Sequence, residues 1–272
     1  MASILEPALT TIAFCWRVER RDGVCLGFTG HDRDLTIGGL VYRTAPGMLP
    51  SAVALSDGFD PGGLDVAGAL TSDAITAADL SAGRWDGAAV SLFMVDWEDP
   101  GGEQVPLARG ALGEVSVKGR GFEAELKGPT ALLERPVVEQ TSPECRAELG
   151  DKRCRVDMAG RVRMTRISAV VDEDVVEVAA AAGGTNLYAY GRMRWMTGAN
   201  SGLESAILKS AGMRLTLREP PPRTPVVGDL VEIGEGCDKR FETCRGRFAN
   251  AENFRGEPHL PGMDLLTRYP GA

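Results

Sequence analysis

The most constraining feature of this chain is a succession of short stretches in which apolar and polar residues alternate. Segments 14–18 and 24–28 each carry apolar side chains at every second position, and a turn at 20–23 separates them. A period of two is that of a β-strand, so this pattern predicts a hairpin. The chain also has 34 glycines and 16 prolines, which suits many short strands joined by turns better than a helical bundle. The sequence therefore predicts a mainly β protein.

The same pattern predicts strands along both halves of the chain. Candidates in the first half are 40–42, 88–97, 111–118 and 121–126, the last two joined by a tight connection at Gly119-Arg120. Candidates in the second half are 163–171, 175–179, 192–196, 203–208, 213–217 and 230–233. Segments 76–80 and 130–133 are long enough only for short helical turns.

The character of the sequence changes near Arg135-Pro136. Residues 139–160 are dense in charge and show almost no periodicity, and the tail from Arg247 onward is rich in asparagine, glycine and proline. A length of 272 residues is enough for two medium domains. We expect an N-terminal β domain at 1–136 and a C-terminal β domain at 137–272, both barrel-like, with an irregular cysteine-rich metal-binding segment in the second.

Composition excludes several classes of function. Hydrophobic residues make up 43% of the chain and charged residues 25%, which is typical of a folded globular protein. The formal charge of -8, from 30 basic and 38 acidic residues, argues against a dedicated DNA-binding domain. The N-terminus lacks the pattern of a signal peptide, and no apolar run reaches the ~18 residues of a membrane span. We therefore expect synthesis in a reducing cytoplasm, where stable disulfides are rare.

Four of the six cysteines form two pairs in charged segments. Cys145 and Cys154 are separated by eight residues, and Cys237 and Cys244 by six. Four thiolates supply a sulfur shell suited to zinc or to an iron–sulfur cluster. Cations flank both pairs and favour the thiolate form of cysteine: Arg146, Lys152, Arg153, Arg155, Lys239, Arg240, Arg245 and Arg247.

The spacing favours an iron–sulfur cluster, but the residues leave alternatives open. Zinc ribbons typically use a C-x2-C turn, whereas these longer loops can surround a bulkier cluster. Zinc, two disulfides and four unrelated buried thiols are the competing interpretations. Cys15 and Cys25 fall on the strands of the first hairpin, so we assign them to the core or the sheet and leave them out of the site.

A resemblance extends along nearly the whole chain. The run 236–244, followed by Arg247-Phe248, Asn250, the segment 253–256 and the segment 258–262, resembles the C-terminal signature of the phage tail-tip (baseplate) hub family, which includes the hub of gene transfer agents. In the first half, 27–29, His31-Asp32-Arg33-Asp34 and 83–88 are also similar to that family. The paired cysteines resemble those of tail tip protein L of phage lambda.

The resemblance implies a function and a set of partners. It implies a homotrimeric ring at the tail tip of a virion, assembled in the bacterial cytoplasm, below a distal tail protein ring and above a central tip or fibre-bearing protein. DNA would pass through its channel during ejection without sequence-specific binding. It also implies that Cys145, Cys154, Cys237 and Cys244 bind an iron–sulfur cluster, of the 4Fe–4S type, with zinc as the alternative.

The residues do not suggest an enzyme. Only two histidines are present, His31 and His259; His31-Asp32 fits a turn after a hairpin, and His259 fits a packing or interface position. We therefore expect a structural, non-catalytic protein. Two other functions remain open, a cytoplasmic iron–sulfur redox protein and a zinc-stapled interaction module.

Overall fold

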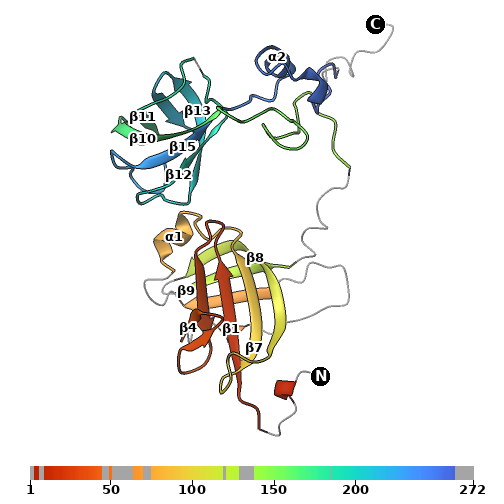
Figure 1. The fold of residues 1–272 in the computed structure, drawn as a ribbon, viewed down its shortest axis with the longest axis vertical. Helices are drawn as coiled ribbons and strands as arrows, with labels where there is room; N and C mark the ends of the chain where they lie inside the picture. The colour runs from red at the N-terminus through yellow and green to blue at the C-terminus, as the bar shows by residue number, and fades with distance from the viewer. Residues whose placement is uncertain are drawn as a thin grey trace. The chain divides into compact units, whose positions relative to one another are not determined.

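The chain consists of two compact units. The computed structural model describes residues 3–5, 9–44, 49–50, 64–69, 75–118, 121–128, 138–184 and 186–260. Contacts divide the chain into residues 1–137 and residues 138–272 (Figure 1). The connection expected at 119–120 and the helical turn expected at 130–133 lie outside the described residues. Within the described part, no helix has the length and hydropathy needed to cross a bilayer.

Unit 1 is built on one nine-stranded sheet. Its elements are η1 (Ser3–Leu5), β1 (Ile12–Glu19), β2 (Cys25–Thr29), β3 (Leu35–Ile37), β4 (Leu40–Thr44), β5 (Leu49–Pro50), β6 (Leu64–Ala69), α1 (Ala77–Ser81), β7 (Ala89–Asp96), β8 (Gln104–Lys118) and β9 (Gly121–Lys127). The strand order is β3-β4-β2-β1-β7-β8-β9-β6-β5, so β3 and β5 are its edges. The sheet is therefore open among the described strands, although we expected a barrel-like domain here.

The first predicted hairpin is present. β1 and β2 are antiparallel, with Trp16 opposite Phe28 and Val18 opposite Leu26. Trp16, Val18 and Phe28 are buried in one core cluster, together with Trp85 of the segment after α1. The alternation in the sequence thus identifies the face of β1 that carries Trp16 and Val18, although Phe14 at the start of the same row is 41% exposed.

A second core lies on the opposite face of β1. Cys15 and Ala13 are buried there with Leu35 and Ile37 of β3. The β3–β4 hairpin therefore covers part of that face, while β4 runs parallel to β2. Cys15 is completely buried, in agreement with its assignment to the core. Strand β3 was not predicted, because three residues are too few for periodicity to be recognised.

Strand β8 is longer than predicted. We expected 111–118, whereas the strand spans Gln104–Lys118. Its first half contains Pro106, which normally argues against a strand interior. Leu92 of β7 pairs with Ala108 and Phe93 pairs with Pro106, so the register shifts at this point. Such a bulge accommodates a proline in a strand.

Unit 2 contains a closed six-stranded barrel. Its elements are β10 (Val162–Val170), β11 (Val175–Val178), β12 (Arg192–Trp195), β13 (Glu204–Ala211), β14 (Arg214–Leu217), β15 (Leu230–Gly234), α2 (Phe241–Gly246) and η3 (Ala251–Asn253). All six strands were predicted. Alternate side chains fill the interior, among them Trp195, Leu215 and Ile233, and the Trp195 indole N–H donates to Ser205 Oγ over 3.0 Å. A mainly β fold is thus confirmed.

The two short helices have different sequence signals. Thr76 caps α1 through a hydrogen bond that its Oγ1 accepts from the Asp79 amide, and the short helical turn expected at 76–80 is confirmed. Helix α2 was not predicted. Its N-cap, Arg240, makes no side-chain capping bond, and its sequence FETCRG has no apolar periodicity.

The barrel interior yields a stability prediction. Leu215 has no exposed surface, whereas Leu208 on the neighbouring strand is 39% exposed. Leu215→Ala should lower the free energy of unfolding by about 2–5 kcal/mol, because a buried cavity replaces the side chain. Leu208→Ala should change it by less than about 1 kcal/mol. Chemical denaturation of both variants checks this, and equal losses would contradict the burial pattern.

Candidate metal centre

Closure of the barrel brings two distant segments together. The first residue of β10, Val162, pairs with the last residue of β15, Gly234. Directly beyond this pair, the Glu235 amide donates to the Arg161 carbonyl over 3.0 Å. The segments 138–161 and 235–260 therefore leave the barrel side by side, as the green and blue parts of unit 2 show in Figure 1. These are the segments that carry the two cysteine pairs.

Backbone hydrogen bonds continue the contact between the segments. The Cys145 amide donates to the Lys239 carbonyl, and the Arg146 amide donates to the Arg255 carbonyl, both over 2.9 Å. Lys239 also donates from Nζ to the Ala147 carbonyl over 2.6 Å. The two cysteine segments thus form one small subdomain held by hydrogen bonds.

Ion pairs reinforce the same contact. Arg146 reaches Glu257 through two hydrogen bonds of 2.7 and 2.9 Å and also pairs with Glu139. Arg153 pairs with the same Glu139. The bond from Arg146 is the main cause that lowers the pKa of Glu257 to about 2. A planar guanidinium facing a carboxylate in this bidentate way fixes both direction and register.

Asn250 connects the two cysteine pairs directly. It is nearly buried, and its Nδ2 donates to the Cys154 carbonyl over 2.6 Å and to Cys154 Sγ over 3.7 Å. Its backbone carbonyl accepts a hydrogen bond from Cys244 Sγ over 3.3 Å. Asn253 donates to Asn250 Oδ1 over 2.7 Å and so holds the side-chain amide in this orientation. One asparagine therefore contacts a cysteine of each pair.

An aspartate organises the loop of each pair. Asp151 Oδ1 accepts from the amides of Arg153 and Cys154, at 2.9 and 2.6 Å. Asp238 accepts from the Arg240 amide and from Thr243 Oγ1, at 3.0 and 2.9 Å. Aspartates in such turns satisfy backbone amides that no regular element would satisfy.

The four thiols influence one another. None of the six cysteines forms a disulfide, and Cys154 and Cys244 are buried. Burial, and to a smaller extent the neighbouring Cys145, Cys237 and Cys154, raise the pKa of Cys244 to about 11. Burial likewise raises the pKa of Cys237. Mutual electrostatic influence of this kind requires the four sulfurs to lie near one another.

The flanking cations have a smaller effect on the thiols than the sequence suggested, although Lys239 does act to lower the pKa of Cys237. We expected them to favour thiolates, yet the pKa values of Cys237 and Cys244 are raised. Arg146 and Arg153 face carboxylates, and Lys239 faces a carbonyl and Glu148. Charge density in the sequence showed that cations were close, but not that carboxylates already neutralised them. Burial therefore outweighs the cations at these thiols.

The four thiols are donors that suit a soft metal, but their side chains are not positioned around a metal ion. Among the described residues, no group of three or more His, Cys, Asp or Glu side chains has the spacing that would hold a metal ion. Four neighbouring thiols are nevertheless the donors that zinc and iron–sulfur clusters use. A backbone amide also reaches one sulfur, from Arg255 to Cys145 over 3.4 Å. The chemistry of the residues fits such a centre.

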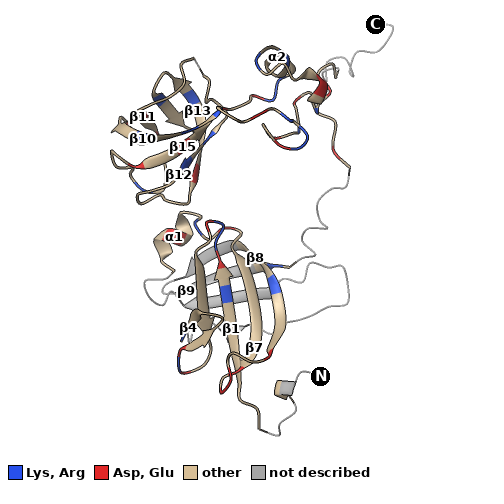
Figure 2. Ribbon diagram, in the orientation of Figure 1, with Lys and Arg blue, Asp and Glu red and all other residues tan. Residues whose placement is uncertain are grey.

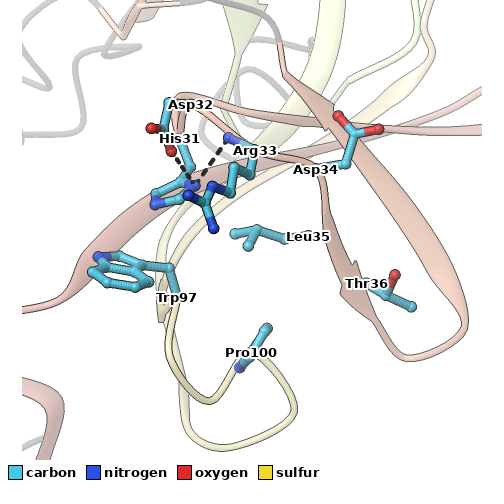
Figure 3. A pocket seen from close by; sticks show the side chains of 8 residues that line it. All are labelled: His31, Asp32, Arg33, Asp34, Leu35, Thr36, Trp97 and Pro100. Carbon is cyan, nitrogen blue, oxygen red and sulfur yellow. Dashed lines mark hydrogen bonds and ion pairs between the residues drawn. The ribbon is translucent and has the colours of Figure 1, made fainter.

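The two histidines lie outside this centre. His31 lines an open cavity of about 620 Å³ in unit 1, where its ring lies 5.1 Å from that of Trp97 (Figure 3). Its Nδ1 accepts from the Arg33 amide over 3.1 Å and lies 3.1 Å from an Asp32 carboxylate oxygen. His259 packs against Phe241, with ring centroids 6.4 Å apart. Each histidine thus occupies the kind of position expected from the sequence.

Comparisons with known proteins decide the family. Residues 1–157 match the family described as "Baseplate hub protein, N-terminal attachment domain". A chain in the structure titled "Virion of native gene transfer agent (GTA) particle" is 39% identical, with a TM-score of 0.86, over 98% of this chain and 94% of that one. The chain belongs to the baseplate hub family. The resemblance inferred from the sequence is thereby confirmed.

Further comparisons add detail on this baseplate hub chain. Residues 186–264 match a second family, described as "Phage conserved hypothetical protein BR0599", which covers most of the barrel and the second cysteine pair. No curated protein matches. A baseplate hub is a component of the virion, so the expected location is confirmed.

The sequence did not reveal the roles of Asn250, which contacts a cysteine of each pair, and of Asp151, which organises the loop of the first pair. Asn250 and Asp151 carry no charge pattern or periodicity that marks them. A signal was nevertheless present, since asparagine and aspartate near a cysteine in an irregular segment often bond to backbone groups. Helix α2 was missed for the same reason, because the bonds that stabilise the segment are not local.

A close backbone approach next to Cys237 gives a second prediction for the hub chain. A Cβ at Gly236 would overlap the Ala189 carbonyl oxygen and the Gly191 nitrogen, whereas the nearest atom to a Cβ at Gly234 is 3.9 Å away. Gly236→Ala should lower the free energy of unfolding by about 1–3 kcal/mol, since the backbone must move. Gly234→Ala is the matched control and should change it little. Denaturation curves that coincide for the two variants would contradict this.

The Arg146–Glu257 pair gives a prediction of pH dependence. Because the folded state lowers the pKa of Glu257 from its ordinary 4.5 to about 2, the pair stabilises the fold above pH 4.5. That stabilisation is lost as the pH falls from about 4.5 toward 2. Glu257→Gln should therefore destabilise the protein at pH 7, and the difference from wild type should shrink by pH 3.

Urea unfolding at pH 7, 5 and 3 checks this. Glu252→Gln is the control, because the Glu252 carboxylate is exposed and forms no ion pair among the described residues. A difference for Glu257→Gln that stays constant with pH would show that the ion pair is not its cause.

Proposed function

We propose that this chain is a structural hub subunit of the tail tip of a phage-like particle and that its four paired cysteines bind an iron–sulfur cluster. The observation that carries the hub assignment is the similarity to a gene transfer agent virion chain over 98% of this chain. The observation that supports the cluster is the meeting of both cysteine pairs in one hydrogen-bonded subdomain. The proposed role is structural and includes no catalytic step.

The particle context suggests the arrangement of the hub. Three subunits would form a ring between a distal tail protein ring and a central tip or fibre-bearing protein. The family description of residues 1–157 as an attachment domain supports a role for unit 1 in docking to a neighbouring protein. The net charge of -8 suits a channel that DNA passes without being held.

The cysteine subdomain needs a source of stability other than apolar burial. The segments 138–161 and 235–260 contribute few residues to a hydrophobic core, and Ala147, Cys154 and Cys244 are their buried apolar side chains. Cys145, Cys154, Cys237 and Cys244 would hold the cluster, whose coordination free energy would become folding free energy. Asn250 would orient the backbone at Cys154 and Cys244, and Asp151 the amide of Cys154.

Zinc is the competing occupant, and a redox role is the competing function. Four thiols suit either metal. The sulfur ligands of a cluster accept hydrogen bonds. Here the backbone amide of Arg255 reaches Cys145 Sγ, and the side-chain amide of Asn250 reaches Cys154 Sγ. These bonds favour the cluster. A redox role lacks comparable support, because the chain's relatives are tail components.

Cys237→Ser tests the proposal. The variant should lose most of its iron and sulfide when purified without oxygen, because one ligand of four is removed, and its melting temperature should fall. Tail-tip assembly, scored by particles that deliver DNA, should fail. Metal and sulfide analysis, visible absorption and electron microscopy of particles are the measurements.

Cys15→Ser is the matched control, because Cys15 is buried in the core of unit 1. Its iron and sulfide content should equal that of wild type. If the wild-type protein is colourless and contains zinc, the occupant of the site is zinc and not a cluster. If it contains neither iron nor zinc, the proposed metal centre is refuted. Fully active particles from Cys237→Ser would refute its structural role.

A further inference from the structure

Strand β3 in unit 1 offers an unpaired edge. Among the strands that the structure describes, it is the last on one side of the nine-stranded sheet and pairs only with β4. Leu35 and Ile37 pack inward against Phe93 and Val95 of β7, so the hairpin lies over the sheet face. An exposed edge of this kind is a template for another extended segment.

Two cavities lie along this edge. The first, of about 620 Å³, is lined by Leu35 and Thr36 of β3 and by Trp97 and Pro100 beyond β7 (Figure 3). The second, of about 510 Å³, begins at Ile37 and is lined on the sheet side by Phe93, Gln104 and Pro106. Each cavity is thus lined by β3 residues on one side and by residues of, or next to, β7 and β8 on the other, one at each end of β3. We refer to the two cavities and the β3 edge between them as the groove.

The end of the groove beyond Ile37 is cationic. Arg17 of β1 lies opposite Ser91 of β7, and Ser91 lies opposite Arg109 of β8, so the three residues form a row on one face. Figure 2 shows the corresponding blue bands on β1 and β8 with β7 between them. With strands about 4.8 Å apart, the two arginines stand roughly 10 Å from each other at the backbone. That leaves room above Ser91 for a carboxylate.

The charges in this cavity are unbalanced. Arg17 pairs with Glu19 over 3.2 Å, whereas Arg109 has no ion pair among the residues that the structure describes. Two guanidiniums therefore face one carboxylate. Guanidinium groups bind carboxylates through paired hydrogen bonds, so an incoming acidic side chain would be favoured here.

The other end of the groove is aromatic. Trp97 is 37% exposed, while Trp16, Trp85 and Trp195 are buried. Arg33 lines the same cavity and forms no ion pair among the described residues. Asp34 accepts from the Thr44 amide and hydroxyl and is therefore already engaged, whereas Asp32 beside His31 is 82% exposed. Exposed tryptophan and arginine are the residues most often found at binding hot spots.

We propose that the free edge of β3 and its two cavities form a docking groove for an extended, acidic segment of another protein. The segment pairs with β3 as an added strand. It places an apolar side chain against Trp97 and Leu35, and a carboxylate between Arg17 and Arg109. This proposal rests on the proposed function only where it names the source of the segment, a neighbouring protein in the tail tip.

A peptide probe tests the groove. The probe is a capped nine-residue peptide of alternating threonine and valine with one phenylalanine and two glutamates, and its twin carries lysines in place of the glutamates. Tryptophan fluorescence of the full chain reports binding, because Trp97 alone among the four tryptophans is substantially exposed. The glutamate probe should bind, with about tenfold or greater preference over the lysine probe at low salt.

Arg109→Glu should reverse this preference, because it replaces the cation without an ion-pair partner by an anion. Arg214→Glu, an exposed arginine of unit 2, is the control and should bind as wild type does. Thermal unfolding should show that both variants fold. A second variant, Trp97→Ala, should weaken binding of a fluorescein-labelled glutamate probe about tenfold, measured by polarisation.

Three outcomes would overturn the proposal. They are no binding of the glutamate probe at about 1 mM, equal binding of both probes, and binding that Arg109→Glu leaves unchanged. Self-association of the free protein that Arg109→Glu abolishes would make a second copy the occupant and refute the assignment to another protein. None of these readouts depends on metal content, so failure of the groove and failure of the cluster proposal are distinguishable.

Discussion

The pairing of β10 with β15 is the interaction on which the cysteine subdomain depends. It closes the barrel and places the Arg161 carbonyl within hydrogen-bonding distance of the Glu235 amide. Bringing two distant segments together costs loop-closure entropy, and here the burial of side chains in the barrel core offsets that cost. The hydrogen bonds and ion pairs beyond the barrel then act between segments that are already neighbours. The proposed metal centre would therefore fix the subdomain and would not have to bring its parts together.

The two units handle strand edges differently. Unit 2 removes them by closing its barrel, and its core is filled by Trp195, Ile207, Leu217 and similar side chains. Unit 1 keeps two edges, one of them at β3. A structural subunit that must both remain folded and bind neighbours benefits from such a division. The closed barrel supports the cysteine segments, and the open sheet would offer backbone groups to the proposed partner.

The sequence was most informative where a side chain packs on one face of a strand. All six barrel strands and the first hairpin followed from period-two alternation, because burial on one face imposes that period. Strand β3 and the first half of β8 did not, since one has three residues and the other contains a proline at a bulge. The cysteine pairs could be recognised from their charged surroundings. The partners of those charges could not, because Glu257 and Arg146 are 111 residues apart in sequence.

The insertion of the barrel between the cysteine pairs has a consequence for biosynthesis. Cys145 and Cys154 leave the ribosome before the barrel strands, and Cys237 and Cys244 leave after them. The barrel is able to fold as soon as β15 emerges, whereas the first pair must wait for the second. Insertion of the proposed metal would accordingly have to wait until both cysteine pairs and the barrel between them have been synthesised. Oxidation of the Cys145 and Cys154 thiols before the second pair has been synthesised would yield subunits with an intact barrel and an incomplete cysteine site.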